Sequence, residues 1–446
     1  MKDPTPVVTE LLQQLIRNRC VNQGTPESGE EFRNADTLAS FLEGSGLDLQ
    51  RYESLPGRTS LVSRIEGRDP RAPSLCLMGH IDVVPVNPDG WERDPFGAEL
   101  VDGVVWGRGA VDMLNTTSSM AVAFKQLASQ GFRPRGDLIF FAAPDEEALG
   151  QHGAKWMTEH EPDAVRADYC ITEFGGMRFP VPTEGGPKLP VMVGEKGTYW
   201  CTIRIHGTPG HASMPLRTDN ALVTAAEVVR RIAAYNPKTE LHDVWRRFVE
   251  RMQFPDEMTK ALLDPDAFDQ LAENLPVGLA RMLSACTHNT FAPTIMHGGV
   301  KTNVIPDTVD LQLDIRTLPG NTGDDVVSQL KAALGDLFDK IEIVDSSEMA
   351  ATESPMDTPL WDTLRKVTRA LVPESDTVPF LIVGATDARF MRTLGTTSYG
   401  YGLLSERIPF NEFAQMFHGD NERVDQESLR LSTELWEATA MEFLAG

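Results

Sequence analysis

Long hydrophobic runs are missing from this sequence of 446 residues. No stretch of about 18 residues is apolar and uncharged enough to span a bilayer, so a membrane-spanning protein is not expected. Cysteines are few and scattered: no Cys-x-x-Cys pair occurs among Cys20, Cys76, Cys170, Cys201 and Cys286. This pattern fits neither a disulfide framework nor a thiolate zinc site, and it favours a reducing cytoplasm.

Positive charge is also scarce. Lys and Arg total 41 against 65 Asp and Glu, which gives a net charge of −24. Such a chain repels a nucleic-acid backbone and an anionic membrane surface, so neither is expected as a partner. The excess carboxylates otherwise solvate the surface.

The sequence does contain enough apolar material for two domains. Hydrophobic residues make up 41% and charged residues 24%, as in ordinary globular proteins, so the bulk is neither disordered nor fibrous. Near the N-terminus, apolar residues recur at helical spacing, which predicts an amphipathic helix of the mature protein rather than a secretion signal.

Strand and helix patterns alternate over roughly the first 180 residues and again from residue 351. SLCLMGH, DLIFFAAP and DYCITE have the apolar content of buried strands, and helical patterns such as TSSMAVAFKQLASQ lie between them. This alternation predicts an α/β domain whose mostly parallel central sheet is covered on both faces.

The pattern changes near residue 180, where PVPTEGGPKLP has the composition of a crossing loop. The next segments predict strands and helices of a two-layer α+β unit, including a long helical stretch at residues 236–288. We therefore predict a first domain formed by residues 1–195 and 351–446, with a second domain, residues 196–350, inserted into it.

Acids and imidazoles follow several predicted strands, where the functional groups of parallel sheets gather. The candidates are His80, Asp82, Asp112, Asp145, Glu146, Glu147, Glu173 and, before the last helix, His418. Taken singly, each has an ordinary explanation as a buried hydrogen-bonded pair or as a solvated turn acid.

Taken together, two imidazoles and several carboxylates suit zinc or a similar first-row divalent ion, and contain too much nitrogen for calcium. Two ions would use the set economically. Asp112 would bridge them, one ion would take His80 and Glu173, and the other would take Glu147 and His418. Glu146 would remain free as a base.

Eight motifs then carry a resemblance to a known family. HIDVVP, WGRGAVDM, PDEE, TEFGG, GTPGHAS, TNVIP with DIR, GATDAR and HGDNERV occur in the order seen in one family of zinc-dependent enzymes. That family comprises aminoacylase, acetylornithine deacetylase, succinyl-diaminopimelate desuccinylase and glutamate carboxypeptidase, in peptidase clan MH. The resemblance implies a phosphorylase/hydrolase-like catalytic domain with an inserted lid that usually also dimerises.

The resemblance implies the same metal set and adds roles for three further residues. Asp82 would orient His80. Glu146 would be the general base that takes a proton from the water held between the metals and passes it to the leaving amine. His211, in GTPGHAS, resembles the lid histidine that stabilises the tetrahedral oxyanion.

On the substrate side, Arg316 and Arg389 resemble residues near the substrate's free carboxylate, for which a guanidinium is a fitting partner. Asn303 resembles a further lid contact, and Gly384 would let backbone amides approach the substrate. Two departures stand out: Leu114, Asn115 and Thr116 replace the Lys-Gly-Gly of many relatives, and the helical stretch at 236–288 is unusually long.

The sequence thus predicts a dinuclear hydrolase that cleaves an N-acyl amino acid or a C-terminal peptide bond. Two zinc ions are expected, with cobalt or manganese as alternatives, and a homodimer formed through the lid. Glu173 stands where dipeptidases tend to have aspartate, which favours a deacylase or carboxypeptidase. The alternatives are a dipeptidase or aminopeptidase of the same family and a non-catalytic metal-binding relative, against which the intact Glu146 argues.

Overall fold

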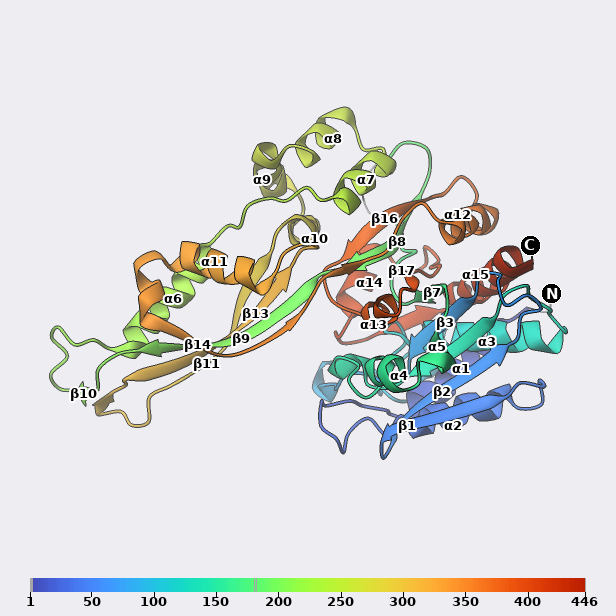
Figure 1. The fold of residues 1–446 in the computed structure, drawn as a ribbon, viewed down its shortest axis with the longest axis horizontal. Helices are drawn as coiled ribbons and strands as arrows, with labels where there is room; N and C mark the ends of the chain where they lie inside the picture. The colour runs from blue at the N-terminus through green and yellow to red at the C-terminus, as the bar shows by residue number, and fades with distance from the viewer. Residues whose placement is uncertain (1–2, 180, 182, 446) are drawn as a thin grey trace.

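The computed structural model describes residues 3–445 apart from positions 180 and 182, which belong to the predicted crossing loop. A body built on a nine-stranded sheet contains the first and last helices, and a smaller sheet extends away from it (Figure 1). The predicted α/β class with a second, smaller α+β unit is confirmed.

The large sheet has the strand order β1-β2-β6-β3-β7-β17-β8-β15, and β16 also pairs with β8. Its strands are β1 (Leu49–Leu55), β2 (Arg58–Ile65), β3 (Leu75–His80), β6 (Leu138–Ala143), β7 (Tyr169–Thr172), β8 (Lys188–Glu195), β15 (Thr352–Glu353), β16 (Asp376–Ile382) and β17 (Thr397–Gly400). The central strands β6, β3, β7 and β17 pair in parallel. The flanking β1, β2 and β15 pair antiparallel, so the sheet is mixed rather than mostly parallel.

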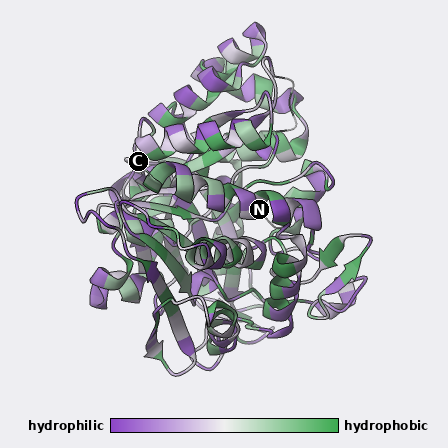
Figure 2. Ribbon diagram, turned by 90° about the vertical axis from the view of Figure 1, so that its right-hand side faces the viewer, coloured by the Kyte–Doolittle hydropathy of each residue, from purple (hydrophilic) through white to green (hydrophobic). Residues whose placement is uncertain are grey.

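Every residue of β3 and β6 is buried, as expected for strands covered on both faces. Two groups of helices cover this sheet. The first contains α1 (Thr5–Arg17), α2 (Phe32–Leu42), α3 (Leu114–Ser129), α12 (Pro359–Leu371) and α15 (Gln426–Ala445), and the second α4 (Ala154–His160), α5 (Pro162–Val165) and α13 (Ala388–Thr393). Figure 2 shows the inner strands coloured mainly as hydrophobic, whereas the outer helices alternate.

The smaller sheet has the order β11-β13-β9-β14. Its strands are β9 (Gly197–His206), β11 (Thr290–Gly298), β13 (Thr308–Thr317) and β14 (Ile341–Met349), and α6 (Ala221–Ala234) and α11 (Gly323–Leu334) pack against it. A two-stranded ribbon of β10 (Gly210–His211) and β12 (Val304–Ile305) lies at the far tip (Figure 1). We call this unit the lid.

The long helical stretch consists of α7 (Asp243–Met252), α8 (Asp256–Leu262), α9 (Pro265–Asn274) and α10 (Val277–Thr287), here called the helical segment. It does not cover the lid sheet. Trp245 and Phe248 of α7 pack with Val378 and Phe380 of β16, so α7 attaches the segment to the large sheet, while α8 and α9 extend outward (Figure 1). The strongly amphipathic α7 buries its apolar side there.

Short elements complete the surroundings of the strand ends. A three-stranded sheet contains β4 (Glu99–Val101), β5 (Val104–Trp106) and β18 (Arg423–Asp425). The helix α14 (Phe410–Met416) precedes β18 in the sequence. Turns of 3₁₀ helix occur at η1 (Pro88–Gly90), η2 (Glu146–Ala148) and η3 (Gly335–Lys340). None of the helices in the described part of the chain combines the length and hydrophobicity needed to cross a bilayer.

Candidate metal centre

Neighbouring parallel strands deliver the candidate ligands to one edge of the large sheet. His80 is the last residue of β3, Glu173 follows β7, and η2 with Glu146 and Glu147 follows β6. Because β6, β3 and β7 are adjacent and parallel, their carboxyl ends lie together. The turn after β5 adds Asp112, and the loop after α14 adds His418.

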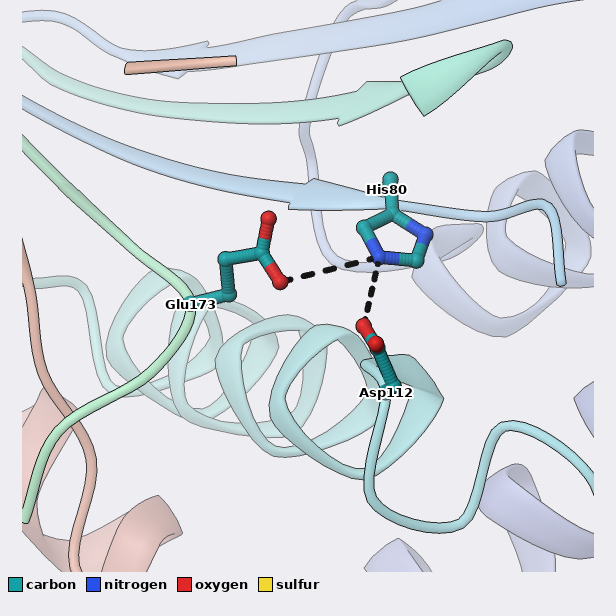
Figure 3. Close-up of side chains that lie close together, drawn as sticks. All are labelled: His80, Asp112 and Glu173. Carbon is teal, nitrogen blue, oxygen red and sulfur yellow. Dashed lines mark hydrogen bonds and ion pairs between the residues drawn. The ribbon is translucent and has the colours of Figure 1, made fainter. Parts of the chain in front are cut away.

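The predicted ligands form two groups that share Asp112. In the first, His80 Nε2 lies 3.1 Å from Asp112 Oδ1 and 3.8 Å from Glu173 Oε2 (Figure 3). In the second, His418 Nε2 lies 3.4 Å from Asp112 Oδ2 and 3.1 Å from Glu147 Oε2. The candidate ligand atoms within each group all lie within 4.8 Å of one another. Asp112 therefore offers one oxygen to each group, as a bridging ligand would.

Several ionisable side chains lie close together in this cluster. Burial raises the pKa values of Glu146 and Glu173 well above the usual carboxyl range, and neighbouring carboxylates add to the effect. Burial and the Asp112 charge raise the pKa of Glu147 to about 7. Its Oε1 is buried with no hydrogen-bond partner among the described residues. A divalent cation would neutralise these groups, and the mixture of imidazole and carboxylate donors suits zinc.

The nearby carboxylates also raise the pKa values of the two histidines. Hydrogen bonds with Asp112 and Glu147 raise the pKa of His418 to about 10. Burial by itself would lower the pKa of His80, but its hydrogen bonds with Asp112 and Asp82 raise it well above the usual value. In the absence of a cation, protons therefore take its place.

Metal removal should make stability depend on pH. A group whose pKa is raised by folding stabilises the protein below its ordinary pKa, and this contribution is lost as pH rises to the raised value. Glu147, raised from 4.5 to about 7, and His418, raised from 6.5 to about 10, both act in this direction. We expect chelator-treated protein to lose thermal stability as pH rises from about 4.5 to about 10, first through Glu147 and then through His418.

Calorimetry of metal-loaded and metal-free protein across this range checks the expectation. The loaded protein is the matched control because it carries the same remaining charges. The difference in Tm between the two forms should widen with pH, since bound cations require deprotonated ligands. If the difference in Tm became smaller as pH rises, the prediction that protons replace the cations in the metal-free protein would be contradicted.

Asp82 connects two parts of the site. His80 Nδ1 lies 3.0 Å from the backbone carbonyl oxygen of Asp82 and 3.5 Å from its carboxylate. The same carboxylate accepts hydrogen bonds from the backbone N–H groups of Glu146 and Glu147, at 3.2 and 3.1 Å, and from the Asn22 side chain at 2.9 Å. Asp82 is thus placed both to orient His80, as predicted, and to fix the η2 turn.

Sequence reasoning missed Glu422, which holds the turn that carries Asp112. Its buried carboxylate accepts hydrogen bonds from the backbone N–H groups of Gly109, Val111 and Asp112 and pairs with Arg108 at 2.8 Å. Its place in HGDNERV, four residues after His418, was the available signal. Asn22 was missed as well, and no local motif marks it.

Strained backbone also occurs beside the candidate ligands. Asp145, Phe174 and His418 have positive φ angles of 69°, 66° and 57°. Residues other than glycine rarely adopt such angles, and strained residues of this kind cluster at functional sites.

A cavity of about 560 Å³ opens at this edge. Among its lining residues are Glu146, Arg316, Gly384 and Arg389, together with four of the five candidate ligands. Arg389 is 6% exposed, and its Nε has no partner among the described residues. Arg316 instead forms two hydrogen bonds with Asp314, at 2.7 and 3.0 Å. Arg389 is therefore the more available of the two guanidinium groups.

The structure places His211 and Asn303 elsewhere. His211 pairs with Val304 in the β10–β12 ribbon, and the carbonyl oxygen of Asn303 accepts a hydrogen bond from Ala212 at 3.1 Å. His211 is exposed, and neither residue lines the cavity. The ribbon lies at the end of the lid that points away from the large sheet (Figure 1).

A sheet edge with two candidate ligand groups, a glutamate outside both groups and a cavity beside them is the arrangement of a two-metal hydrolase. The chain belongs to peptidase family M20/M25/M40, whose sequence profile matches residues 76–442. The family resemblance predicted from the motifs is thereby confirmed.

Several characterised relatives are similar over most of the chain. The N-fatty-acyl-amino acid synthase/hydrolase PM20D1 of Xenopus tropicalis is 27% identical over 92% of this chain and 82% of its own. Aminoacylase-1 of Mus musculus is 27% identical over 96% and 93%. The M20 metallo-carboxypeptidase Sso-CP2 of Sulfolobus solfataricus has the same fold, with a TM-score of 0.72 at 17% identity and 99% coverage of both chains.

Proposed function

We propose that the protein is a deacylase that uses two divalent metal ions to release a free amino acid from an N-acyl amino acid. One observation carries the proposal: the cavity beside the two ligand groups also holds a buried arginine, Arg389, whose Nε is unpartnered among the described residues. A guanidinium binds a carboxylate through two parallel hydrogen bonds. An N-acyl amino acid presents such a carboxylate next to its scissile amide.

In this proposal His80 and Glu173 would hold one ion, Glu147 and His418 would hold the other, and Asp112 would contribute to both. Zinc suits these donors, with cobalt and manganese as alternatives. Bound there, the two ions would polarise the amide carbonyl and lower the pKa of water.

Glu146 acts as the general base. It takes a proton from the attacking water and delivers it to the leaving nitrogen. Burial raises the pKa of Glu146, and a pKa closer to the working pH allows one carboxyl group both to accept a proton and to return it. No hydrogen bond holds its carboxylate among the described residues, while Asp82 fixes its backbone.

Removing the substrate's charge should weaken catalysis. An amidated substrate leaves the buried Arg389 without its anion, so kcat/KM for an N-acetyl amino acid amide should be roughly ten- to hundredfold lower than for the free acid. Steady-state kinetics on the pair checks this. Arg389→Met should remove the discrimination, whereas Arg316→Met, the matched control, should change it less because Arg316 already pairs with Asp314. Equal rates for acid and amide would contradict the carboxylate site.

The same assay separates the alternatives. A dipeptidase or aminopeptidase requires a free amine and would prefer unblocked dipeptides to their N-acyl forms. A non-catalytic relative would hydrolyse neither group of substrates after metal loading.

We further propose a homodimer formed through the lid, with His211 completing the partner's site. Two observations support it: the β10–β12 ribbon with His211 lies away from the cavity of its own chain, and the adjoining loops expose Met214, Leu216 and Val300 by 69%, 84% and 95%. Apolar side chains that are exposed together mark association surfaces. A cytoplasmic location stays a prediction, with which the five free cysteines agree.

Mixing two inactive variants tests the dimer. In a two-fold dimer, a hybrid of one Glu146→Ala and one His211→Ala subunit has one site with both lesions and one intact site. After subunit exchange, half the dimers are hybrids, so activity should return to about a quarter of the wild-type value. Exchange without recovery of activity would show that His211 does not act across the interface.

A further inference from the structure

The larger part of the cavity is apolar and is not explained by catalysis. Its ionisable lining residues are four of the candidate ligands, Glu146 and the two arginines, while the remainder is mainly aromatic and aliphatic. The aromatic part is formed by Phe174, Phe179, Phe380, Phe410, Phe413 and Phe417. Apolar surface open to a substrate in this way usually binds an apolar part of it.

The aromatic rings that line the cavity form two clusters, and the first lies beside the metal centre. Phe174 directly follows Glu173, Phe417 directly precedes His418, and their ring centroids lie 5.0 Å apart. Phe413 packs against Phe417 at 5.2 Å. This first cluster therefore adjoins one candidate ligand of each group.

The second cluster contacts the helical segment. Phe179 lies 5.3 Å from Phe380 and 6.0 Å from Phe410, and Phe248 of α7 packs against both Phe179 and Phe380, at 5.4 and 4.9 Å. Met282 of α10 lines the same cavity. The helical segment thus supplies part of the pocket wall and supports the rest.

The chemistry of the substrate decides which part of it enters this pocket. This step rests on the proposed deacylase function. The carboxylate of an N-acyl amino acid is separated from the scissile nitrogen by one carbon, so the amino acid must remain near Arg389. The acyl group leaves the carbonyl in the other direction, towards the remaining space, which is the aromatic pocket.

We propose that the acyl group is large and apolar, a medium-length alkyl chain or an aryl group, and that Met282 is a specificity-determining residue for its length. Among the described residues that line this cavity, none at the aromatic end has a charged or amide side chain, so an acyl group with a second carboxylate, such as succinyl, would be buried there without a partner. Each added methylene that becomes buried should raise kcat/KM by up to about fourfold.

The test varies the acyl group on one amino acid. With the metal-loaded enzyme, kcat/KM should rise from N-acetyl through N-butanoyl to N-octanoyl, and N-succinyl should be poor. Met282→Phe should lower the ratio of octanoyl to acetyl activity. Met282→Ala should raise the activity on acyl chains longer than octanoyl relative to the activity on acetyl. Arg281→Phe, at the neighbouring exposed position of α10, is the matched control and should leave the ratio unchanged.

Two results would overturn the assignment. N-acetyl or N-succinyl substrates that are cleaved at least as well as N-octanoyl would exclude an apolar acyl pocket, and a length profile that neither Met282 variant shifts would exclude Met282 as its determinant. A second series keeps the acetyl group and varies the size of the amino acid side chain. If kcat/KM rose in this series as it does with acyl length, the pocket would bind the amino acid side chain instead of the acyl group. Absence of hydrolysis for every acyl length would instead contradict the deacylase proposal itself.

Discussion

Replacing Glu146 with Gln is expected to lower turnover by about a hundred- to ten-thousand-fold, the usual loss when a general base is removed. Glu146 belongs to neither ligand group, and its backbone N–H, held by Asp82, is unchanged by the substitution. The variant should therefore retain metal ions and substrate affinity. Steady-state kinetics and elemental analysis on the same preparation provide both measurements.

Glu147→Gln is the matched control, because the two glutamates are adjacent and only Glu147 lies within 3.1 Å of His418. It should lose metal as well as activity. Near-normal turnover in Glu146→Gln would show that another group is the base. Asp387, buried with both carboxylate oxygens unpartnered among the described residues, would be the first to examine.

Replacing Asp112 with Ala is expected to remove both ions. Its two oxygens lie 3.1 Å from His80 and 3.4 Å from His418, so one substitution weakens both groups. Metal content should fall from about two ions per chain to almost none, and activity should be abolished, since both ions would be needed for hydrolysis. Elemental analysis after dialysis checks the content.

Comparison with two other variants makes this result specific. Glu173→Ala removes a ligand from one group only and should retain more metal than Asp112→Ala. Glu422→Gln keeps all ligands but alters the hydrogen bonds that hold the Asp112 turn and removes the ion pair with Arg108, so metal affinity should fall by the roughly 10- to 100-fold typical of such partners. Two ions retained by Asp112→Ala would exclude it as the bridge.

Much of the candidate site could be predicted from the sequence because it depends on local signals. A run of buried apolar residues predicts a strand, and adjacent parallel strands bring their carboxyl ends to the same edge. His80 at the end of β3, Glu147 after β6 and Glu173 after β7 are located by this rule, and the structure brings them together. The family could also be predicted from the sequence, because its motifs are short local patterns that occur in a fixed order.

The sequence could not show which residues surround these ligands, because hydrogen-bond partners and packing neighbours are set by contacts between distant parts of the chain. Glu422 holds the backbone of Asp112 from 310 residues away, and Asn22 holds Asp82 across 60. The pairing of Arg316 with Asp314 is local, yet only the structure shows which of the two arginines remains unpaired.

The sequence by itself determined the α/β class and the set of ligand candidates, since these depend on residue periodicity and on the residue types that follow the apolar runs. Tertiary structure decided where the inserted elements lie. Residues 243–287 have a helical pattern that would fit either sheet, and only their packing on Phe380 of β16 places them beside the cavity. His211 sits in a motif that resembles an active-site histidine, but the extended lid sheet carries it to the far tip, because strand length and sheet direction, not the motif, set its position.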